Sequence, residues 1–126
     1  MKKTLAIIGG SGFEDIPNLK QKMKVKTPYG TVAVKSGLVK GAKIYFLPRH
    51  GERHTFAPHM INYRANIYAL KKLGANYIIA TAIVGSLDKN IKPGELCLLS
   101  DFIDVTKSRK QTFFEGSKVV HTDMTE

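Results

Sequence analysis

The sequence is poor in the residues that mark secreted and membrane-spanning proteins. Tryptophan is absent, and Cys97 is the only cysteine among 126 residues. A single thiol excludes a disulfide framework and a metal site built from several cysteines. Apolar runs are also short: residues 5–8 are followed at once by two glycines, which does not fit a signal peptide, and no run approaches the ~20 residues of a membrane span. We therefore expect a cytoplasmic protein that has no membrane partner.

Arginine is scarce in a chain that is otherwise strongly basic. The formal net charge is +10, yet only four of the 20 basic residues are arginines. Between residues 20 and 43 the lysines often alternate with apolar residues, as they do on the solvent-facing side of a hairpin. Proteins that read bases or follow a phosphate backbone use more arginine and more exposed aromatic residues than this. We favour a solvated basic surface, and nucleic acid is not expected as a partner.

The spacing of apolar residues predicts elements in the order strand, hairpin, strand, helix, strand, strand. The strands are expected at residues 4–8, 43–47, 77–84 and 96–99 with a short bridge at 102–103, the hairpin at 22–26 and 31–34, and a turn at 92–95. Asn62 would cap a helix that runs to about Leu73. The apolar run at residues 77–84 is typical of a central parallel strand, and Cys97 would be an inert thiol buried in the last strand.

This order of elements predicts the α/β class, with a mixed central sheet flanked by helices. Residues 1–126 would belong to a single domain, because no linker or repeat divides the chain. One helix cannot cover both faces of such a sheet. We therefore expect the fold to be incomplete at the end of this chain, with something else covering the exposed face.

The loop that follows the strand at residues 43–47 has the composition of an anion site. It begins with Arg49 and His50. A guanidinium offers a planar fork of donors that fits a phosphate, and an imidazole beside it adds a further donor. Because both residues stand where a strand opens into a loop, we expect their side chains to reach a bound oxyanion.

A second candidate for anion binding is the glycine-rich turn at residues 9–12. Its backbone N–H groups and the Ser11 hydroxyl could face a phosphate oxygen. The turn does not match the dinucleotide-binding fingerprint, since Asp15 stands where the third glycine belongs, and it lacks the Gly-Lys-Ser/Thr of the P-loop. A tight turn without a ligand is the alternative interpretation of these residues.

Two other kinds of site fit the sequence less well. The histidines at positions 50, 54 and 59 have few carboxylates nearby, and the arginines of the same loop would repel a cation, so no metal is expected. A nucleophilic triad built on Ser11 or Ser86 would lack the strained Gly-x-Ser-x-Gly turn that presents a reactive serine.

Seven short segments, taken together, carry a family resemblance. They are IIGGSG at 7–12, Arg49-His50-Gly51 with His54, NYRAN at 62–66, GSL at 85–87, KPGE at 92–95, DFID at 101–104 and QTFFEG at 111–116. In this order and spacing they resemble the N-terminal half of the methylthioadenosine phosphorylase group of the trimeric purine nucleoside phosphorylases. The similarity runs from Thr4 to the last residue.

The resemblance implies roles for individual residues. Ser11, Arg49 and His50 match the family's phosphate-binding residues. Ala82 and Ile83 match a Thr-Ala pair that contacts phosphate, where Ala82 would keep only a backbone N–H contact. His121 matches a residue that crosses a trimer interface into the neighbour's 5′-substituent pocket. The family implies no cofactor and no metal, since inorganic phosphate is a co-substrate, and its base-protonating acid lies in a C-terminal half that is absent here.

The function implied is that of a pentosyltransferase in purine salvage. It would convert a purine nucleoside, 5′-methylthioadenosine or 5′-methylthioinosine, and phosphate into the free purine and (methylthio)ribose 1-phosphate. The complete protein would be a trimer or hexamer, and the 126-residue chain alone would be inactive unless a separate C-terminal polypeptide completes it. The choice between adenine and a 6-oxopurine stays open, and so does the choice between a 5′-methylthio group and a 5′-hydroxyl, although the Arg49-His50-Gly51 form of the loop favours methylthio substrates. A noncatalytic phosphate- or nucleotide-binding module, or a degenerate fragment, is the alternative.

Overall fold

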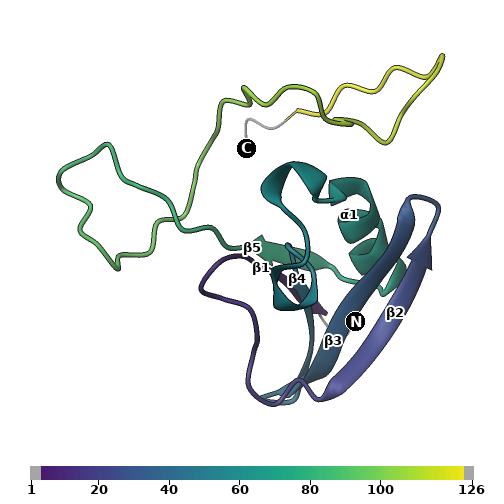
Figure 1. The fold of residues 1–126 in the computed structure, drawn as a ribbon, viewed down its shortest axis with the longest axis horizontal. Coiled ribbons are helices and arrows are strands. Elements are labelled where there is room, and N and C mark those ends of the chain that lie inside the picture. The colour runs from purple at the N-terminus through teal and green to yellow at the C-terminus, as the bar shows by residue number, and fades with distance from the viewer. Residues whose placement is uncertain (1–3, 124–126) are drawn as a thin grey trace. The chain divides into compact units, whose positions relative to one another are not determined.

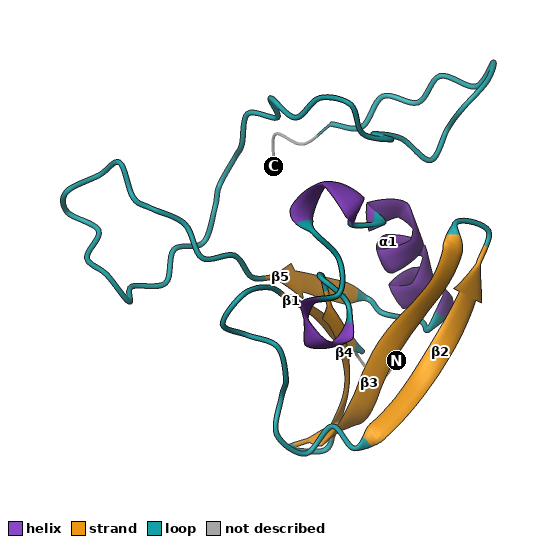
Figure 2. Ribbon diagram, in the orientation of Figure 1, coloured by secondary structure: helices purple, strands orange, loops and turns teal. Residues whose placement is uncertain are grey.

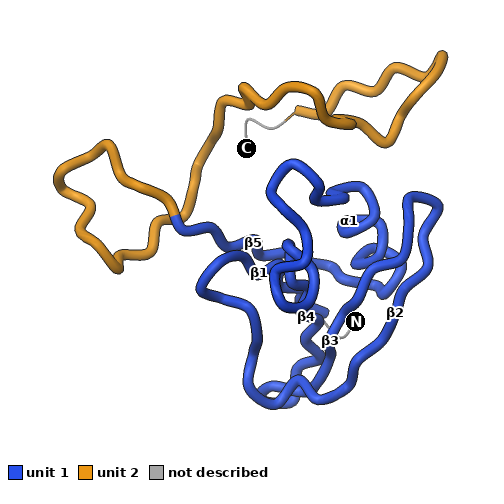
Figure 3. The backbone as a smooth tube through the Cα atoms, viewed as in Figure 1, with its two compact units in different colours: residues 1–83 blue, residues 84–126 orange. Residues whose placement is uncertain are grey.

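The computed structural model describes residues 4–123 and divides the chain into two compact units, residues 1–83 and residues 84–126 (Figure 3). Residues 1–3, which include two more of the lysines, and residues 124–126 lie outside the described residues. The assignment of residues 1–126 to a single domain stays a prediction.

The first unit is built on a mixed five-stranded sheet, which confirms the predicted fold class (Figure 1). Its strand order is β2-β3-β4-β1-β5; β1 runs parallel to β4 and β5, and β2, β3 and β4 are antiparallel. The predicted hairpin is β2 with β3. The bounds are Leu5–Gly9 for β1, Gln21–Thr27 for β2, Gly30–Val39 for β3, Ala42–Pro48 for β4 and Tyr77–Ala80 for β5.

One face of the sheet is covered by the helix α1, Tyr63–Lys72 (Figure 2). Alternate residues of a strand point to the same face, so Ala6 and Ile8 of β1 and Leu47 of β4 enter one apolar core. The helix contributes Ala69 and Leu70, which are fully buried in that core. Packing against the sheet therefore fixes the helix, and with it the segment that connects β4 to β5.

The opposite face is covered in part by the segment between β1 and β2. Phe46 of β4 is fully buried there with Leu19 and Ile44. The ring of Phe13 meets the ring of Phe46 edge to face, with centroids 5.8 Å apart and planes at 88°. Residues 13–19 cover part of this face, because the glycine turn reverses the chain just after β1.

The predicted boundaries of α1 are confirmed. The Asn62 side-chain oxygen accepts a hydrogen bond from the backbone N–H of Ala65 at 3.1 Å, which satisfies one of the donors left free at the start of a helix. The Asn62 amide also donates to the carbonyl of Tyr29 at 2.6 Å, so the same residue ties the helix to the β2–β3 turn. Gly74, with φ of 78°, ends the helix in the left-handed region.

The last strand of the sheet differs from its prediction. The sequence indicated a central strand over residues 77–84, but β5 ends at Ala80 and forms an edge. Tyr77 and Ile79 are 54% and 52% exposed. In the part of the chain that the structure describes, β5 pairs with β1 alone, so its second edge has no partner strand.

The second unit is irregular over its described residues, 84–123, which contain no helix and no strand. The predicted turn at Lys92 is present: the N–H of Glu95 donates to the Lys92 carbonyl at 3.1 Å. The predicted strand at 96–99 and the bridge at 102–103 are wrong, because no described strand pairs with either segment. Leu96 is fully exposed, and Cys97 is exposed rather than buried.

Over residues 4–123, none of the helices is both long enough and apolar enough to cross a bilayer.

Candidate functional site

The candidate site lies where the parallel strands β1, β4 and β5 end. Gly9 pairs with Pro48 at the last position of the β1–β4 ladder, and the N–H of Thr81, just beyond β5, donates to the carbonyl of Ile8 at 3.0 Å. Parallel strands bring their carboxyl ends to one edge of a sheet, which is where α/β proteins bind ligands. The glycine turn after β1 and the loop after β4 therefore face the same region.

Arg49 is fixed by two backbone groups from the neighbouring strands. Its N–H donates to the carbonyl of Gly9 at 2.8 Å, and its Nη1 donates to the carbonyl of Thr81 at 2.8 Å. The guanidinium lies against Gly10, where a side chain would overlap it. A guanidinium has five N–H donors, so the bond to Thr81 leaves others for an anion. The side chain is half-buried and lies along the glycine turn.

His50 is held by the loop that follows β4. Its Nδ1 lies 3.0 Å from the carbonyl of Phe56, and the N–H of Phe56 donates to the carbonyl of His50 at 2.8 Å. A carbonyl only accepts, so Nδ1 carries the hydrogen and Nε2 stays available to a ligand. Gly51, with φ of 77°, lets the loop from His50 to Phe56 close tightly, since a β-carbon at position 51 would lie 2.7 Å from the Phe56 ring.

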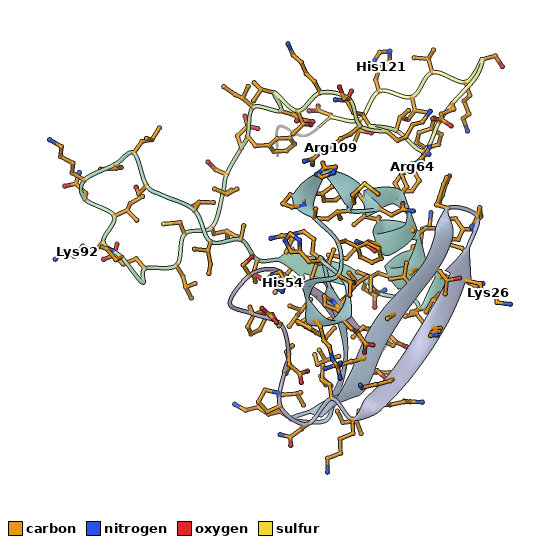
Figure 4. The ribbon with its side chains drawn as sticks, in the orientation of Figure 1. Lys26, His54, Arg64, Lys92, Arg109 and His121 are labelled. Atoms are coloured by element: carbon orange, nitrogen blue, oxygen red, sulfur yellow. The ribbon has the colours of Figure 1, made fainter. Side chains whose placement is uncertain are left out.

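His54 connects the two loops. It lies in the short 3-10 helix η1, Glu52–His54, and its side chain can be followed in Figure 4. Its Nε2 is 3.3 Å from the hydroxyl oxygen of Ser11, and its Nδ1 is 3.1 Å from a carboxylate oxygen of Glu14. The His54 ring is stacked on the ring of His50, with centroids 4.9 Å apart and planes at 9°.

The backbone around His54 is in an uncommon conformation. Arg53 and His54 have φ of 58° and 55°, in the left-handed region that residues with a side chain seldom adopt. Such conformations cost energy and occur often at functional sites, where they aim a side chain. Here they direct the His54 ring to the segment between β1 and β2.

These residues surround a small recess of about 10 Å³, which has room for one water-sized group. Its walls come from the ends of β1 and β4 and from the two loops: Gly9, Gly10, Glu14, Pro48, Arg49, His50, Gly51 and His54. A larger cavity of about 640 Å³ lies between β3, the β4 loop and α1, and it shares Pro48, Arg49 and Gly51 with the recess. Arg49 thus borders both hollows.

An ion pair anchors the segment that carries Ser11 and Glu14. Asp15 lies 2.9 Å from the Nζ of Lys35 on β3 and accepts the backbone N–H of Ile16 at 2.9 Å. The hydrogen bond from Lys35, followed by that from Ile16, lowers the pKa of Asp15 below its ordinary value. The β1–β2 segment is therefore held to the sheet by a charge as well as by its apolar residues.

The residues predicted for the site are brought together in part. Arg49 and His50 line the recess, whereas Ser11 is not one of its lining residues but contacts His54, whose ring is stacked on that of His50. Ile83 is 77% exposed, yet its Cδ1 atom lies so close to Gly12 that a β-carbon there would be 2.8 Å away. Ala82 is exposed next to Thr81. His121 belongs to the second unit and is exposed, and its role at a subunit interface stays a prediction.

Two contributors to the site were missed by the sequence analysis. Thr81 acts through its backbone carbonyl, which no side-chain pattern can reveal. Glu14 was not considered as a site residue; the available signal was its position three residues after Ser11.

The sheet and the recess define an α/β protein with a candidate anion site at the ends of its parallel strands. The chain belongs to the phosphorylase superfamily, whose family model matches residues 4–126.

Curated relatives match nearly the whole chain. A probable 6-oxopurine nucleoside phosphorylase of Moorella thermoacetica is 49% identical over 126 residues, covering 96% of this chain and 48% of the relative. An S-methyl-5′-thioadenosine phosphorylase of Pyrococcus horikoshii is 45% identical over 122 residues, covering 95% of this chain and 48% of the relative. The chain therefore spans about half the length of the curated relatives that it matches.

Solved structures show the same fold. Methylthioadenosine phosphorylase from Schistosoma mansoni in complex with adenine superposes with a TM-score of 0.85 at 40% identity, over 92% of this chain and 43% of the other. The apo form of that enzyme gives a TM-score of 0.85 at 41% identity, over 93% of this chain and 43% of the other. The family resemblance seen in the sequence is thereby confirmed.

Proposed function

We propose that this chain supplies the phosphate-holding part of a purine nucleoside phosphorylase. The observation that carries the proposal is the convergence of Arg49, His50 and the Ser11 turn on one recess at the ends of β1 and β4. The recess admits only a water-sized group, so a phosphate would insert one oxygen and keep the others at its mouth. The curated relatives bear the names of purine nucleoside phosphorylases, which supports the same reaction class.

The chemistry follows from where the anion would lie. Phosphorolysis passes through a sugar with oxocarbenium character, and a phosphate held below the anomeric carbon stabilises that cation before forming the new bond. Arg49 and His50 would orient this nucleophile, with Ser11 as a further hydroxyl contact and the backbone at Ala82 and Ile83 as a last one. No metal and no organic cofactor is needed, because inorganic phosphate is itself a substrate.

The finer proposal concerns substrate and assembly. We assign a 5′-methylthio purine nucleoside, because the Arg49-His50-Gly51 form of the loop resembles that of methylthioadenosine phosphorylases. The relatives' names include both methylthioadenosine and 6-oxopurine enzymes, so the base is not assigned. We propose that the protein acts in the cytoplasm, where the free thiol of Cys97 would stay reduced. We also propose that it assembles as a trimer or hexamer, in which His121 would reach a neighbour's site.

An assay of purine release tests the proposal. The 126-residue chain would be incubated with 5′-methylthioadenosine, 5′-methylthioinosine or inosine, with and without phosphate, and again after addition of the C-terminal half of a relative as a separate polypeptide. We expect phosphate-dependent release only in the completed mixture. Phosphate binding without release in any mixture would favour the alternative of a noncatalytic phosphate-binding module, and release by the chain alone would contradict the assignment of the acid to the other half.

A further inference from the structure

Ser11, His54 and Glu14 form a line of three hydrogen-bonding side chains, of which His54 and Glu14 line the recess. The Ser11 hydroxyl oxygen is 3.3 Å from His54 Nε2, and His54 Nδ1 is 3.1 Å from Glu14 Oε1. The proposed function gives a role to Ser11 alone. A carboxylate beside an anion site costs binding energy by repulsion, so Glu14 requires a separate explanation.

The positions of the hydrogens follow from the chemistry of each group. An ionised carboxylate only accepts, so His54 Nδ1 carries a hydrogen whether the ring is neutral or cationic. When the ring is neutral, Nε2 is an acceptor, and the Ser11 hydroxyl donates its only hydrogen to it. In the cationic ring Nε2 donates to the Ser11 oxygen, and the hydroxyl hydrogen becomes free for another acceptor.

An oxyanion in the recess needs donors. A fully ionised oxyanion has no hydrogen to give, so the Ser11 hydroxyl helps to bind it only when its own hydrogen points to the anion. We propose that Glu14 and His54 are positioning residues that set the direction of the Ser11 hydroxyl, and that binding of an oxyanion takes up one proton at His54 Nε2. This inference rests on the proposed function for the assignment of Ser11 to phosphate.

The charged groups around His54 fit this coupling. Glu14 faces Nδ1 and stabilises the cationic ring, and Arg49 lines the same recess. The stacked His50 ring has its Nδ1 engaged by the Phe56 carbonyl. Within η1, Arg53 adjoins His54 in the chain. The carboxylate of η1, Glu52, is 3.6 Å from the ammonium group of Lys22, which balances its charge. A bound oxyanion would offset the positive charge that the added proton brings.

Sulfate is the appropriate probe, because it stays fully ionised across neutral pH while phosphate changes its own protonation. The 126-residue chain would be titrated with sulfate by calorimetry at pH values from about 6 to 8, the range in which imidazoles change charge. Repeating the titration in buffers of different ionisation enthalpy counts the protons taken up. We expect uptake at the upper end of the range, and roughly a tenfold loss of affinity from pH 6 to 8.

Four variants separate the contributions. His54→Gln replaces the imidazole with a side chain that cannot take up a proton, and we expect it to flatten the pH dependence of sulfate binding. Glu14→Gln should reduce proton uptake, and Glu14→Asp should restore it. His59→Gln is the matched control, since His59 is exposed in the 3-10 helix η2, Pro58–Met60, and does not line the recess; it should bind as the parent chain does. Circular dichroism would verify that each variant is folded.

The results distinguish this inference from the proposed function. Unchanged pH dependence in His54→Gln would overturn the coupling and leave phosphorolysis standing. Proton-coupled sulfate binding without purine release in the completed mixture would overturn phosphorolysis and leave the coupling standing. If the parent chain bound neither sulfate nor phosphate at any pH, both proposals would be wrong.

Discussion

The guanidinium of Arg49 lies so close to the α-carbon of Gly10 that a β-carbon at position 10 would overlap its Nη2 atom. The same β-carbon would stand 3.2 Å from the carbonyl oxygen of Thr81, which accepts the bond from Arg49. The glycine turn is thus shaped around the arginine, and the absence of a side chain at position 10 lets the guanidinium reach the recess.

A methyl group at position 10 should therefore weaken anion binding. In Gly10→Ala the guanidinium must move away from the recess, and we expect phosphate affinity to fall by about tenfold or more, the size of one hydrogen bond to a charged group. The melting temperature should fall only modestly, because the overlapping atoms are the end of the Arg49 side chain and the Thr81 carbonyl at 3.2 Å needs to give only slightly. Gly85→Ala is the matched control, since nothing lies within 4 Å of a β-carbon there. Equal phosphate affinity in the two variants would contradict the prediction.

At the neighbouring Gly9, a methyl group should mainly lower the stability of the fold. A β-carbon at Gly9 would meet the backbone carbonyl of Phe13 and the buried ring of Phe46, neither of which can move without disturbing the core. We expect Gly9→Ala to lower the free energy of unfolding by about 1–3 kcal/mol. Urea denaturation followed by circular dichroism measures this, and a variant as stable as the parent chain would show that the turn is looser than the structure indicates.

Removal of the guanidinium tests the anion site directly. We expect Arg49→Ala to abolish measurable phosphate binding and Arg49→Lys to restore only part of it, because an ammonium lacks the planar fork of donors. Arg53→Asn removes the same charge from the same loop, and Asn tolerates the left-handed conformation of residue 53. Arg53 does not line the recess, so this control should keep nearly full affinity. Similar losses in both variants would mean that the loop acts only through its net charge.

Local patterns were sufficient to predict the elements that carry the site. Apolar runs and, in the hairpin, apolar alternation located β1 to β4, and the placement of Arg49 and His50 at a strand end followed from the strand predicted at residues 43–47. Asn62 marked the start of α1 because capping depends on a single residue. These signals are contained in a few neighbouring positions, so one sequence can reveal them.

The predictions that failed concern structure that depends on partners distant in the chain. Residues 96–99 have a strand-like apolar composition, but in the described residues no other strand pairs with them, and Cys97 is exposed as a result. The contacts of Glu14 with His54 and of Arg49 with the Thr81 carbonyl join separate loops. They depend on the sheet register, which apolar spacing alone does not specify.

The double role of Asn62 predicts a measurable loss of stability. Asn62→Ala removes the cap on the Ala65 N–H and the donor to the Tyr29 carbonyl, and we expect a cost of about 1–2 kcal/mol in the free energy of unfolding. Asn62→Asp keeps the cap but not the donor, so its stability should lie between that of the parent chain and that of Asn62→Ala. Asn90→Ala, in the second unit, is the control. Thermal denaturation gives the ranking, and equal stability of the Ala and Asp variants would exclude a contribution from the cap.

The ion pair between Asp15 and Lys35 predicts a stability term that depends on pH. The pKa of Asp15 is lowered in the folded protein, chiefly by the hydrogen bond from Lys35, so its carboxylate stabilises the fold at pH values above the pKa of an unfolded aspartate, about 3.9. That contribution is lost as the pH falls through the lowered folded-state pKa. We expect Asp15→Asn to melt below the parent chain at pH 7, and the difference to shrink steadily below about pH 4. In a Lys35→Gln background the effect of Asp15→Asn at pH 7 should be smaller, since the main cause of the shift is gone. A difference in melting temperature that persisted undiminished at pH 2 would show that the charge of Asp15 does not hold the Ser11 segment to β3.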